Sequence, residues 1–190
     1  MKVVDLSVNI DEDTPVFPGD PHPSITQIAS IEKDGWNEKR LCFNSHFSTH
    51  IDAPFHMLTD GKRLDEFSIE FFFGEAIVID ARERDRIDLS GIKENDFVFL
   101  YTGSLDGNIT VEIAQQLIDK GVKIIGVDSL SPDKEPFEVH KMLFRKEILI
   151  VECLANLDKL IGRRFECVIL PLKIKNADGA PCRVVARLND

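Results

Sequence analysis

Two apolar runs and the helical pattern that follows them constrain the fold of this chain more than any other feature. Residues 75–80 (EAIVID) and 97–102 (FVFLYT) are continuous apolar segments of strand length, which is typical of a sheet covered on both faces. Thr110 then precedes a helical pattern that Gly121 closes, and residues 123–128 form the next apolar strand. Strand, helix and strand in this order predict a βαβ unit and an α/β fold.

The carboxyl-terminal edge of such a unit is where open α/β sheets bind ligands. We expect residues 102–103 and 128–129, which end two of the strands, to meet at this edge. Residues 140–145 have helical character, and residues 147–152 form an apolar strand that ends in Glu152. A carboxylate buried alone is costly, so Glu152 indicates a nearby cation, with an arginine partner or simple exposure as alternatives.

Histidine and aspartate are concentrated in one short segment, residues 45–56. His46, His50 and His56 lie there together with Asp52. Imidazole and carboxylate suit zinc or a similar divalent ion, and two histidines with one aspartate leave positions open for water, as catalytic sites do. We therefore predict a metal site, against the simpler interpretation that each histidine is an ordinary hydrogen-bonded residue of a strand.

The spacing of these ligands predicts a bend in the chain. Residues 41–52 alternate between apolar and polar, which is the period of a half-buried strand. In an extended strand, His46 and His50 would lie about 13 Å apart at roughly 3.3 Å per residue, too far to share one ion. We predict a strand to about residue 45 and then a tight bend, with Pro54 ending any helical turn soon after.

The N-terminal segments predict two further strand regions and a stiff loop. Residues 3–10 alternate as a strand, and residues 25–31 and 40–45 predict a strand pair joined by a polar turn. Residues 14–21 hold three prolines and a glycine, so they predict a rigid loop that could wall a small-molecule pocket. Phe17 in this loop is a candidate substrate-binding residue, and packing in the core is the alternative.

A charged and aromatic segment follows the histidine motif. Residues 63–73 predict a short element that is helical at its start and ends at Gly74. Phe71, Phe72 and Phe73 within it are expected in the core or in a subunit interface rather than against a ligand.

Composition limits the class of protein. The chain of 190 residues, 43% of them hydrophobic, predicts a single domain over residues 1–190. It shows neither a signal peptide nor an apolar membrane span, so we expect a soluble cytoplasmic protein. The net charge of −10 argues against nucleic acid as a partner. No C-x-x-C pair occurs, so the cysteines are expected to be reduced core residues: Cys42, Cys153, Cys167 and Cys182.

The histidine segment resembles a known family motif. HFSTHIDAPFH at residues 46–56 is similar to the H-x-G-T-H-x-D-x-P-x-H motif of the metal-dependent cyclase family, which includes bacterial-type kynurenine formamidases and isatin hydrolases. Weaker family segments recur in order along nearly the whole chain: residues 5–7, 14–20, 126–129, 170–172 and 178–181. Two departures occur, since Ser48 replaces the usual glycine and Phe17 stands where the formamidases have a substrate-contacting tryptophan.

The resemblance implies a hydrolase with two zinc ions, Mn²⁺ being the alternative. It implies a single-domain mixed sheet with helices in the swivelling β/β/α arrangement of the family, assembled as a homodimer or larger oligomer. His56 is the implied general acid/base, and Asp52 is the implied bridge between the ions. The implied ligands are His46, His50, Asp52, His140 and Glu152.

Three functions are consistent with these features. The leading one is an arylformamidase, a metal-dependent amidohydrolase that cleaves a C–N bond, with N-formyl-L-kynurenine of tryptophan catabolism as the first substrate to test. The second keeps the chemistry and changes the substrate to a cyclic amide or lactone of the isatin type. The third is a metal-binding module without catalysis, in which a histidine that is not a ligand, such as His56, would have no purpose.

Overall fold

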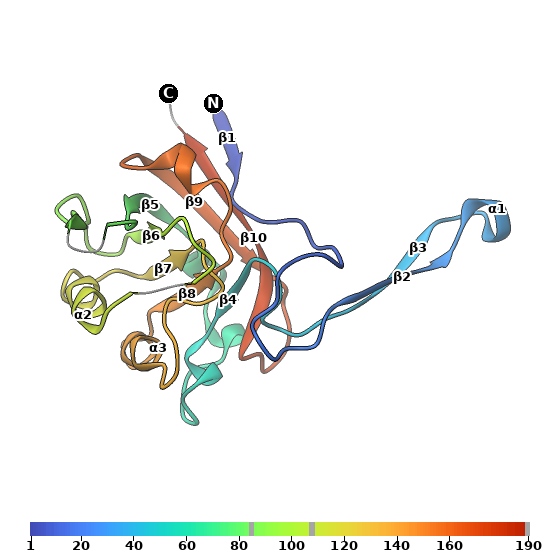
Figure 1. Cartoon of the computed structure of the whole chain (residues 1–190), viewed down its shortest axis with the longest axis horizontal. Helices are drawn as coiled ribbons and strands as arrows, with labels where there is room; N and C mark the ends of the chain where they lie inside the picture. Colours follow the sequence, from blue (N-terminus) through green and yellow to red (C-terminus); the bar gives the residue numbers. More distant parts are fainter. Residues whose placement is uncertain (84–85, 107–108, 189–190) are drawn as a thin grey trace.

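The computed structural model of the chain describes residues 1–83, 86–106 and 109–188 (Figure 1). The strands of its main sheet are β1 (Lys2–Asp5), β4 (His50–Asp52), β5 (Phe73–Asp80), β6 (Phe97–Tyr101), β7 (Ile124–Val127), β8 (Leu149–Glu152), β9 (Arg164–Pro171) and β10 (Gly179–Leu188). A separate hairpin consists of β2 (Ser24–Ala29) and β3 (Glu38–Cys42), with α1 (Ile31–Asp34) at its tip. The other helices are α2 (Val111–Asp119), α3 (Glu138–Phe144) and the 3-10 helices η1 (Pro54–His56), η2 (Leu64–Glu66), η3 (Ile69–Phe72) and η5 (Leu157–Leu160).

The main sheet closes into a mixed barrel. Its strands follow the order β1-β10-β4-β8-β7-β6-β5-β9, and β9 also pairs with β10, so all of them except β1 form a closed ring. β5, β6, β7 and β8 are parallel neighbours, whereas the pairs that involve β4, β9 or β10 are antiparallel. The predicted α/β class with a mixed sheet is confirmed.

The predicted βαβ unit is present as β6, α2 and β7. The Thr110 hydroxyl caps α2 by accepting from the backbone N–H of Ile113 at 3.3 Å, and Gly121 follows the helix with a φ of 68°. At the carboxyl ends of the two strands, the Asp128 carboxylate accepts from the backbone N–H of Thr102 and of Gly103. The expected meeting of these strand ends is therefore confirmed.

Apolar side chains fill both faces of the parallel strands. Phe97 and Phe99 of β6 point into the barrel interior, while Val98 and Leu100 of the same strand point to the other face. That outer face is covered by α2 and α3, which bury residues such as Leu143 against it. Burial on both faces explains why these strands are continuous apolar runs rather than alternating ones.

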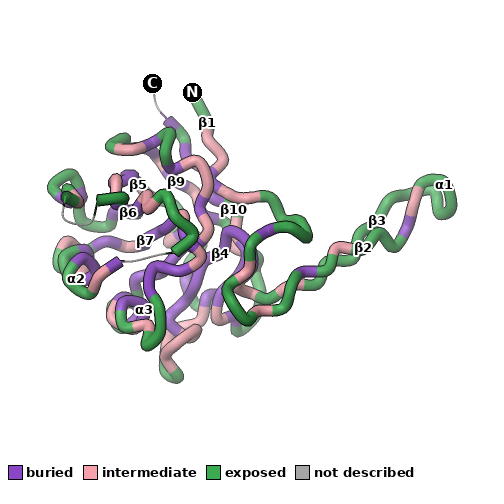
Figure 2. The backbone as a smooth tube through the Cα atoms, in the orientation of Figure 1, coloured by how far each residue is buried: buried purple, intermediate pink, exposed green. Residues whose placement is uncertain are grey.

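The β2–β3 hairpin projects away from the barrel as an arm (Figures 1 and 2). The two strands pair with each other in a register that places Thr26 opposite Arg40, which confirms the predicted strand pair. All of β3 is exposed, and so is Trp36 at 58%. Cys42 at the base of the arm is also exposed, so its expected place in the core is wrong, whereas Cys167 is buried as expected.

Two predicted elements differ from the structure. The strand expected over residues 3–10 ends at Asp5, because the Ser7 N–H binds the Asp5 carboxylate and the Val8 N–H binds the Thr49 hydroxyl instead of a neighbouring strand. The segment 63–73 forms only the 3-10 helices η2 and η3, since β5 already begins at Phe73.

Gly74 does not end a helix but lies within β5. A side chain at this position would approach the ring of Phe97 to 3.0 Å, so the glycine makes room for a core phenylalanine. Phe72 is buried and Phe73 is 46% exposed, so the three consecutive phenylalanines are divided between core and surface. Within the described part of the chain, no helix combines the length and the apolar character needed to cross a membrane.

Candidate metal centre

A turn brings the two halves of the histidine motif together. Residues 45–46 form a turn and residues 48–49 a bend between β3 and β4. Ser48 has a φ of 60°, in the left-handed region that favours glycine, which is the residue usual at this position of the motif. The predicted tight bend between His46 and His50 is confirmed, although the preceding strand ends at Cys42 rather than near residue 45.

Strand pleating directs His50 and Asp52 to one face of β4. Ile51 between them is fully buried in the barrel interior, so its neighbours point to the opposite face, which the helices cover. In the antiparallel register of β4 against β8, His50 lies opposite Glu152. Val151 also points into the interior, so Glu152 points to the same face as His50.

Helix α3 covers this face and contributes His140, which is buried together with the two carboxylates. Its Nε2 lies 3.3 Å from Glu152 Oε1 and 4.0 Å from Asp52 Oδ2. Its Nδ1 is hydrogen-bonded to the carboxylate of Asp133. The expectation that His140 and Glu152 meet the histidine motif in space is therefore met, although they lie far from it in the chain.

His50 has a ring nitrogen without a hydrogen-bond partner. Its Nδ1 lies 2.8 Å from the carbonyl oxygen of Ser48, which can only accept, so Nδ1 carries a proton. Its Nε2 lies 3.3 Å from Asp52 Oδ1 and 3.2 Å from Glu152 Oε2 without hydrogen-bonding to either. Over the described ranges, it is the one buried side-chain nitrogen or oxygen left in this condition. A cation shared with the two carboxylates would satisfy it.

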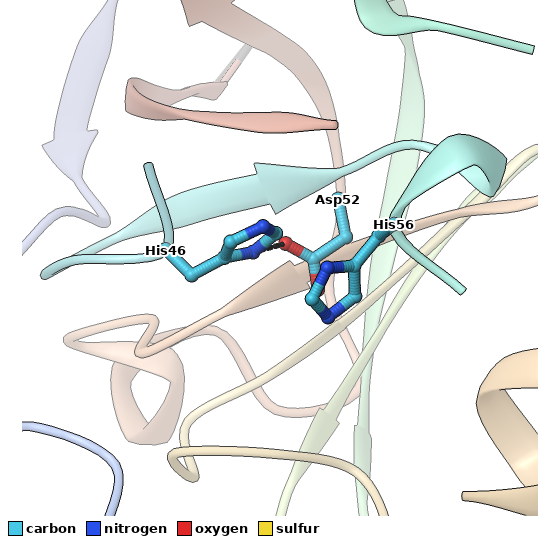
Figure 3. Close-up of side chains that lie close together, drawn as sticks. All are labelled: His46, Asp52 and His56. Atoms are coloured by element: carbon cyan, nitrogen blue, oxygen red, sulfur yellow. Dashed lines mark hydrogen bonds and ion pairs between the residues drawn. The ribbon is translucent and has the colours of Figure 1, made fainter. Parts of the chain in front are cut away.

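His46 lies between two carboxylates. Its Nδ1 is 2.7 Å from Asp52 Oδ1, and its Nε2 is 2.7 Å from Asp178 Oδ2. Figure 3 shows the Asp52 carboxylate beside both His46 and His56, and the ring centroids of these two histidines are 3.9 Å apart. Gly179 makes room for this arrangement, because a Cβ there would lie 2.7 Å from His46 Cε1.

The carboxylates raise the pKa of three of the imidazoles and so favour positive charge on His46, His50 and His140. Burial alone lowers the pKa of His46, but the charge and hydrogen bond of Asp52, together with Asp178, outweigh burial and raise it to about 10. Burial likewise lowers the pKa of His140, and the hydrogen bonds with Asp133 and Glu152 raise it to about 9. A divalent cation that took the place of these protons would release them.

The pKa of His56 is shifted in the opposite direction. Burial lowers it, and the nearby imidazoles of His46 and His140 lower it further, while Asp52 acts against them. The ring is partly exposed, with Nδ1 3.9 Å from Asp178 Oδ2. His56 is therefore a neutral imidazole at neutral pH, which can accept a proton.

The donor set fits a divalent metal ion. Nitrogen and carboxylate oxygen atoms are the donors that zinc and manganese accept in proteins. Among the described residues, two groups bring one donor atom per residue within 4.8 Å of one another, and both include the buried Asp52. His56 belongs to one of them, so its expected role as a general acid/base rather than a metal ligand stays a prediction. The two groups are His46, Asp52 and His56, and His50, Asp52 and Glu152.

The cluster opens into a pocket of about 410 Å³. Its polar wall includes His46, His56 and Glu152, and its apolar wall includes Phe17 and Phe137, whose ring centroids are 6.4 Å apart. Phe17 is 39% exposed, so it lines the pocket rather than filling the core. Its role in substrate binding stays a prediction.

Sequence reasoning missed two carboxylates of the centre. Asp133 binds His140, and Asp178 binds His46. Neither is adjacent to the histidine in the chain, and acidic residues in loops are common, so only the position of Asp178 within the motif-like segment 178–181 offered any signal.

Fold and site together define a class. A mixed α/β barrel with a buried cluster of histidine, aspartate and glutamate that opens into a pocket is the architecture of a metal-dependent hydrolase. The particular family follows from residues 4–134, which match the family model described as "Putative cyclase". The chain belongs to the cyclase family.

Similar proteins agree with this assignment. The chain is 32% identical to the kynurenine formamidase of Bacillus anthracis, over 98% of this chain and 97% of that protein. The isatin hydrolase A of Labrenzia aggregata has a similar structure, with a TM-score of 0.83 and 25% identity over 100% of this chain and 94% of the other. A structure described as a potential metal-dependent hydrolase with cyclase activity gives a TM-score of 0.81 and 30% identity over 99% of both chains.

Proposed function

We propose that this protein is an arylformamidase, a metal-dependent amidohydrolase that cleaves the C–N bond of an aryl formamide, with N-formyl-L-kynurenine as the first substrate to test. The observation that carries the proposal is the buried cluster around Asp52, which opens into a pocket with an aromatic wall. The full-length similarity to a kynurenine formamidase supports the choice of substrate.

The ligands we propose are His46, His50, Asp52, His140 and Glu152, for two zinc ions with Asp52 between them. When bound, such ions lower the pKa of water to near 7 and polarise the substrate carbonyl. The unpartnered His50 Nε2 and the Nε2 atom of His140 face the two carboxylates, as this assignment requires.

His56 is the proposed general acid/base. Its imidazole lines the pocket beside the cluster, and its lowered pKa leaves it neutral and able to accept a proton at neutral pH. The same imidazole can then return this proton to the departing amine nitrogen. Phe17, on the apolar wall, is the proposed contact for the aromatic ring of the substrate.

A substrate panel tests the proposal. Protein loaded with Zn²⁺ or Mn²⁺ is expected to hydrolyse N-formyl-L-kynurenine or another aryl formamide with release of formate. Turnover of other amides with none of any aryl formamide would overturn it. The similarity to isatin hydrolase A favours cyclic amides as the second candidate class, so isatin belongs in the same panel.

The metal content of the purified protein tests both hydrolase proposals. Elemental analysis of protein purified without chelator is expected to find at least one equivalent of a transition metal per chain. A metal-loaded protein that turns over no amide would instead favour a metal-binding module without catalysis.

We also propose that the protein is a homodimer. An isolated two-stranded hairpin is marginally stable in water, yet the β2–β3 arm carries exposed apolar side chains, including Ile28 at 45%, Trp36 at 58% and Leu41 at 52%. A second copy that packs against the arm would bury these side chains.

A further inference from the structure

We propose that Asp133 is a positioning residue that fixes the tautomer and the direction of His140, so that the Nε2 lone pair faces the metal cluster. The inference rests on the proposed metal-dependent function, but its test measures metal affinity rather than turnover. Asp133 is outside the histidine motif and lies in the loop between β7 and α3.

Both oxygens of the Asp133 carboxylate are occupied by consecutive residues of α3. Oδ2 accepts a hydrogen bond from the backbone N–H of Val139 at 2.8 Å, and Oδ1 accepts from Nδ1 of His140. Asp133 is largely buried, at 9% exposure, so little bulk water competes for its carboxylate. The backbone N–H of Val139 holds one carboxylate oxygen in place, and the other oxygen in turn orients the His140 ring.

This contact decides which ring nitrogen of His140 carries the lone pair. An ionised carboxylate only accepts, so the proton of a neutral His140 is on Nδ1 and the lone pair is on Nε2. Nε2 is the atom that lies 3.3 Å from Glu152 Oε1 and 4.0 Å from Asp52 Oδ2. A carboxylate that holds the far nitrogen of a ligating imidazole both orients the ring and increases its basicity.

His50 shows the same arrangement with a different acceptor. Its Nδ1 donates to the carbonyl oxygen of Ser48, and its Nε2 faces Asp52 and Glu152. In both buried imidazoles, a hydrogen-bond acceptor therefore holds Nδ1, while Nε2 faces the cluster. For His50 the chain uses its own backbone two residues away, whereas His140 depends on the side chain of Asp133.

The variant Asp133→Asn separates positioning from packing, because it keeps the shape but has one acceptor and one donor. If the amide oxygen keeps the Val139 N–H, the amide nitrogen faces His140 Nδ1 and favours the tautomer with the proton on Nε2. If the amide is reversed, its nitrogen faces the Val139 N–H. Neither orientation reproduces both native hydrogen bonds.

The readout is the affinity for Zn²⁺, measured by competition with a chromophoric chelator. We expect Asp133→Asn to weaken binding by about 10–100-fold, the usual effect of removing such a partner. Asp133→Glu, which keeps a carboxylate, should restore part of the loss. The matched control is Asp128→Asn, because both carboxylate oxygens of Asp128 are likewise occupied, here by the backbone N–H groups of Thr102 and Gly103, neither of which belongs to the cluster. The control should bind Zn²⁺ like the wild type.

A measurement on the wild type covers the case in which Asp133→Asn does not fold. In the zinc-loaded protein, ¹⁵N NMR of the imidazoles should show His140 with its proton on Nδ1. A proton on Nε2, or wild-type Zn²⁺ affinity in a folded Asp133→Asn, would overturn the inference. Wild-type protein that binds no divalent metal would overturn both the inference and the proposed function. Binding without turnover of any amide would overturn the proposed function alone.

Discussion

Ser48 adopts a strained backbone conformation in the turn between His46 and His50. Its φ of 60° is open to glycine at no steric cost, and a serine tolerates it at some cost in free energy. The same residue provides the carbonyl oxygen that holds His50 Nδ1. The departure from the family glycine is therefore compatible with the turn, and the backbone angle explains why a small residue occurs here.

A branched side chain at this position should disrupt the turn. We expect Ser48→Val to reduce the free energy of unfolding by about 1 kcal/mol, because serine already bears part of the cost of this backbone region and a β-branched residue tolerates it less, while Ser48→Gly should lose little. Urea denaturation of the metal-stripped proteins measures both. A Ser48→Val variant as stable as the wild type would show that the turn does not require a left-handed backbone conformation at position 48.

Removal of His56 should separate catalysis from metal binding. We expect His56→Ala to lower kcat on the best substrate by about 10²–10⁴-fold, the usual contribution of general acid–base catalysis, with the metal content unchanged. Because burial lowers the pKa of His56, wild-type activity limited by this group should rise with pH in a limb below 6.5 and be level by pH 7. Metal loss in the variant would identify His56 as a ligand instead.

At the scale of elements, the centre depends on the close approach of β10 to β4. Gly179 of β10 pairs with Asp52 of β4, and a side chain there would lie 2.7 Å from His46 Cε1 and 2.9 Å from the Ile51 carbonyl oxygen. Contacts this short with backbone cannot be relieved by a side-chain rotation, so the strand pair itself would have to shift.

Gly179→Ala should therefore damage the metal site. We expect weaker Zn²⁺ binding and lower activity, because the added methyl group displaces His46 or separates the two strands. Gly91→Ala is the control, since its new Cβ would meet only the end of the flexible Ile77 side chain, at 3.2 Å. Equal Zn²⁺ affinity in the two variants would contradict a need for glycine at position 179.

At the scale of the whole molecule, the cluster of histidines and carboxylates around Asp52 links the free energy of unfolding to pH. His46 has its folded-state pKa raised from 6.5 to about 10 by Asp52 and Asp178, against the effect of burial. A raised pKa contributes stability that is fully present below the unfolded value and is lost as pH rises through the folded value.

Metal-stripped protein should consequently lose stability between about pH 6.5 and pH 10. Metal-loaded protein should lose less over this range, because the cation replaces the protons and binds more tightly as they leave. Thermal melts at several pH values, with and without chelator, test this difference. A constant Tm for the stripped protein over the range would show that His46 is not protonated in the fold.

The arm makes a separate prediction for assembly. If a second copy buries the exposed apolar side chains of the β2–β3 hairpin, the wild type should be a dimer by light scattering at micromolar concentration. Trp36→Asp should shift it toward the monomer, and Glu32→Gln, a change in a polar side chain of the same arm, should not. A monomeric wild type would contradict the proposed homodimer.

Much of this protein could be predicted from short-range patterns. The apolar runs of β5 and β6, the capped helix α2 and the bend between His46 and His50 depend on residues close together in the chain. Their side-chain period, caps and turns have local physical causes. The kind of metal ion could be predicted as well, because the residue types alone limit which ions their donor atoms can bind.

Tertiary structure alone decided how the centre is completed. The register of β4 against β8 places Glu152 opposite His50, and α3 brings His140 with its partner Asp133 to the same face. Such contacts join distant parts of the chain, and they depend on the packing of the whole barrel rather than on any local preference. The sequence by itself determined which groups could bind a metal, and the closed barrel decided which of them meet.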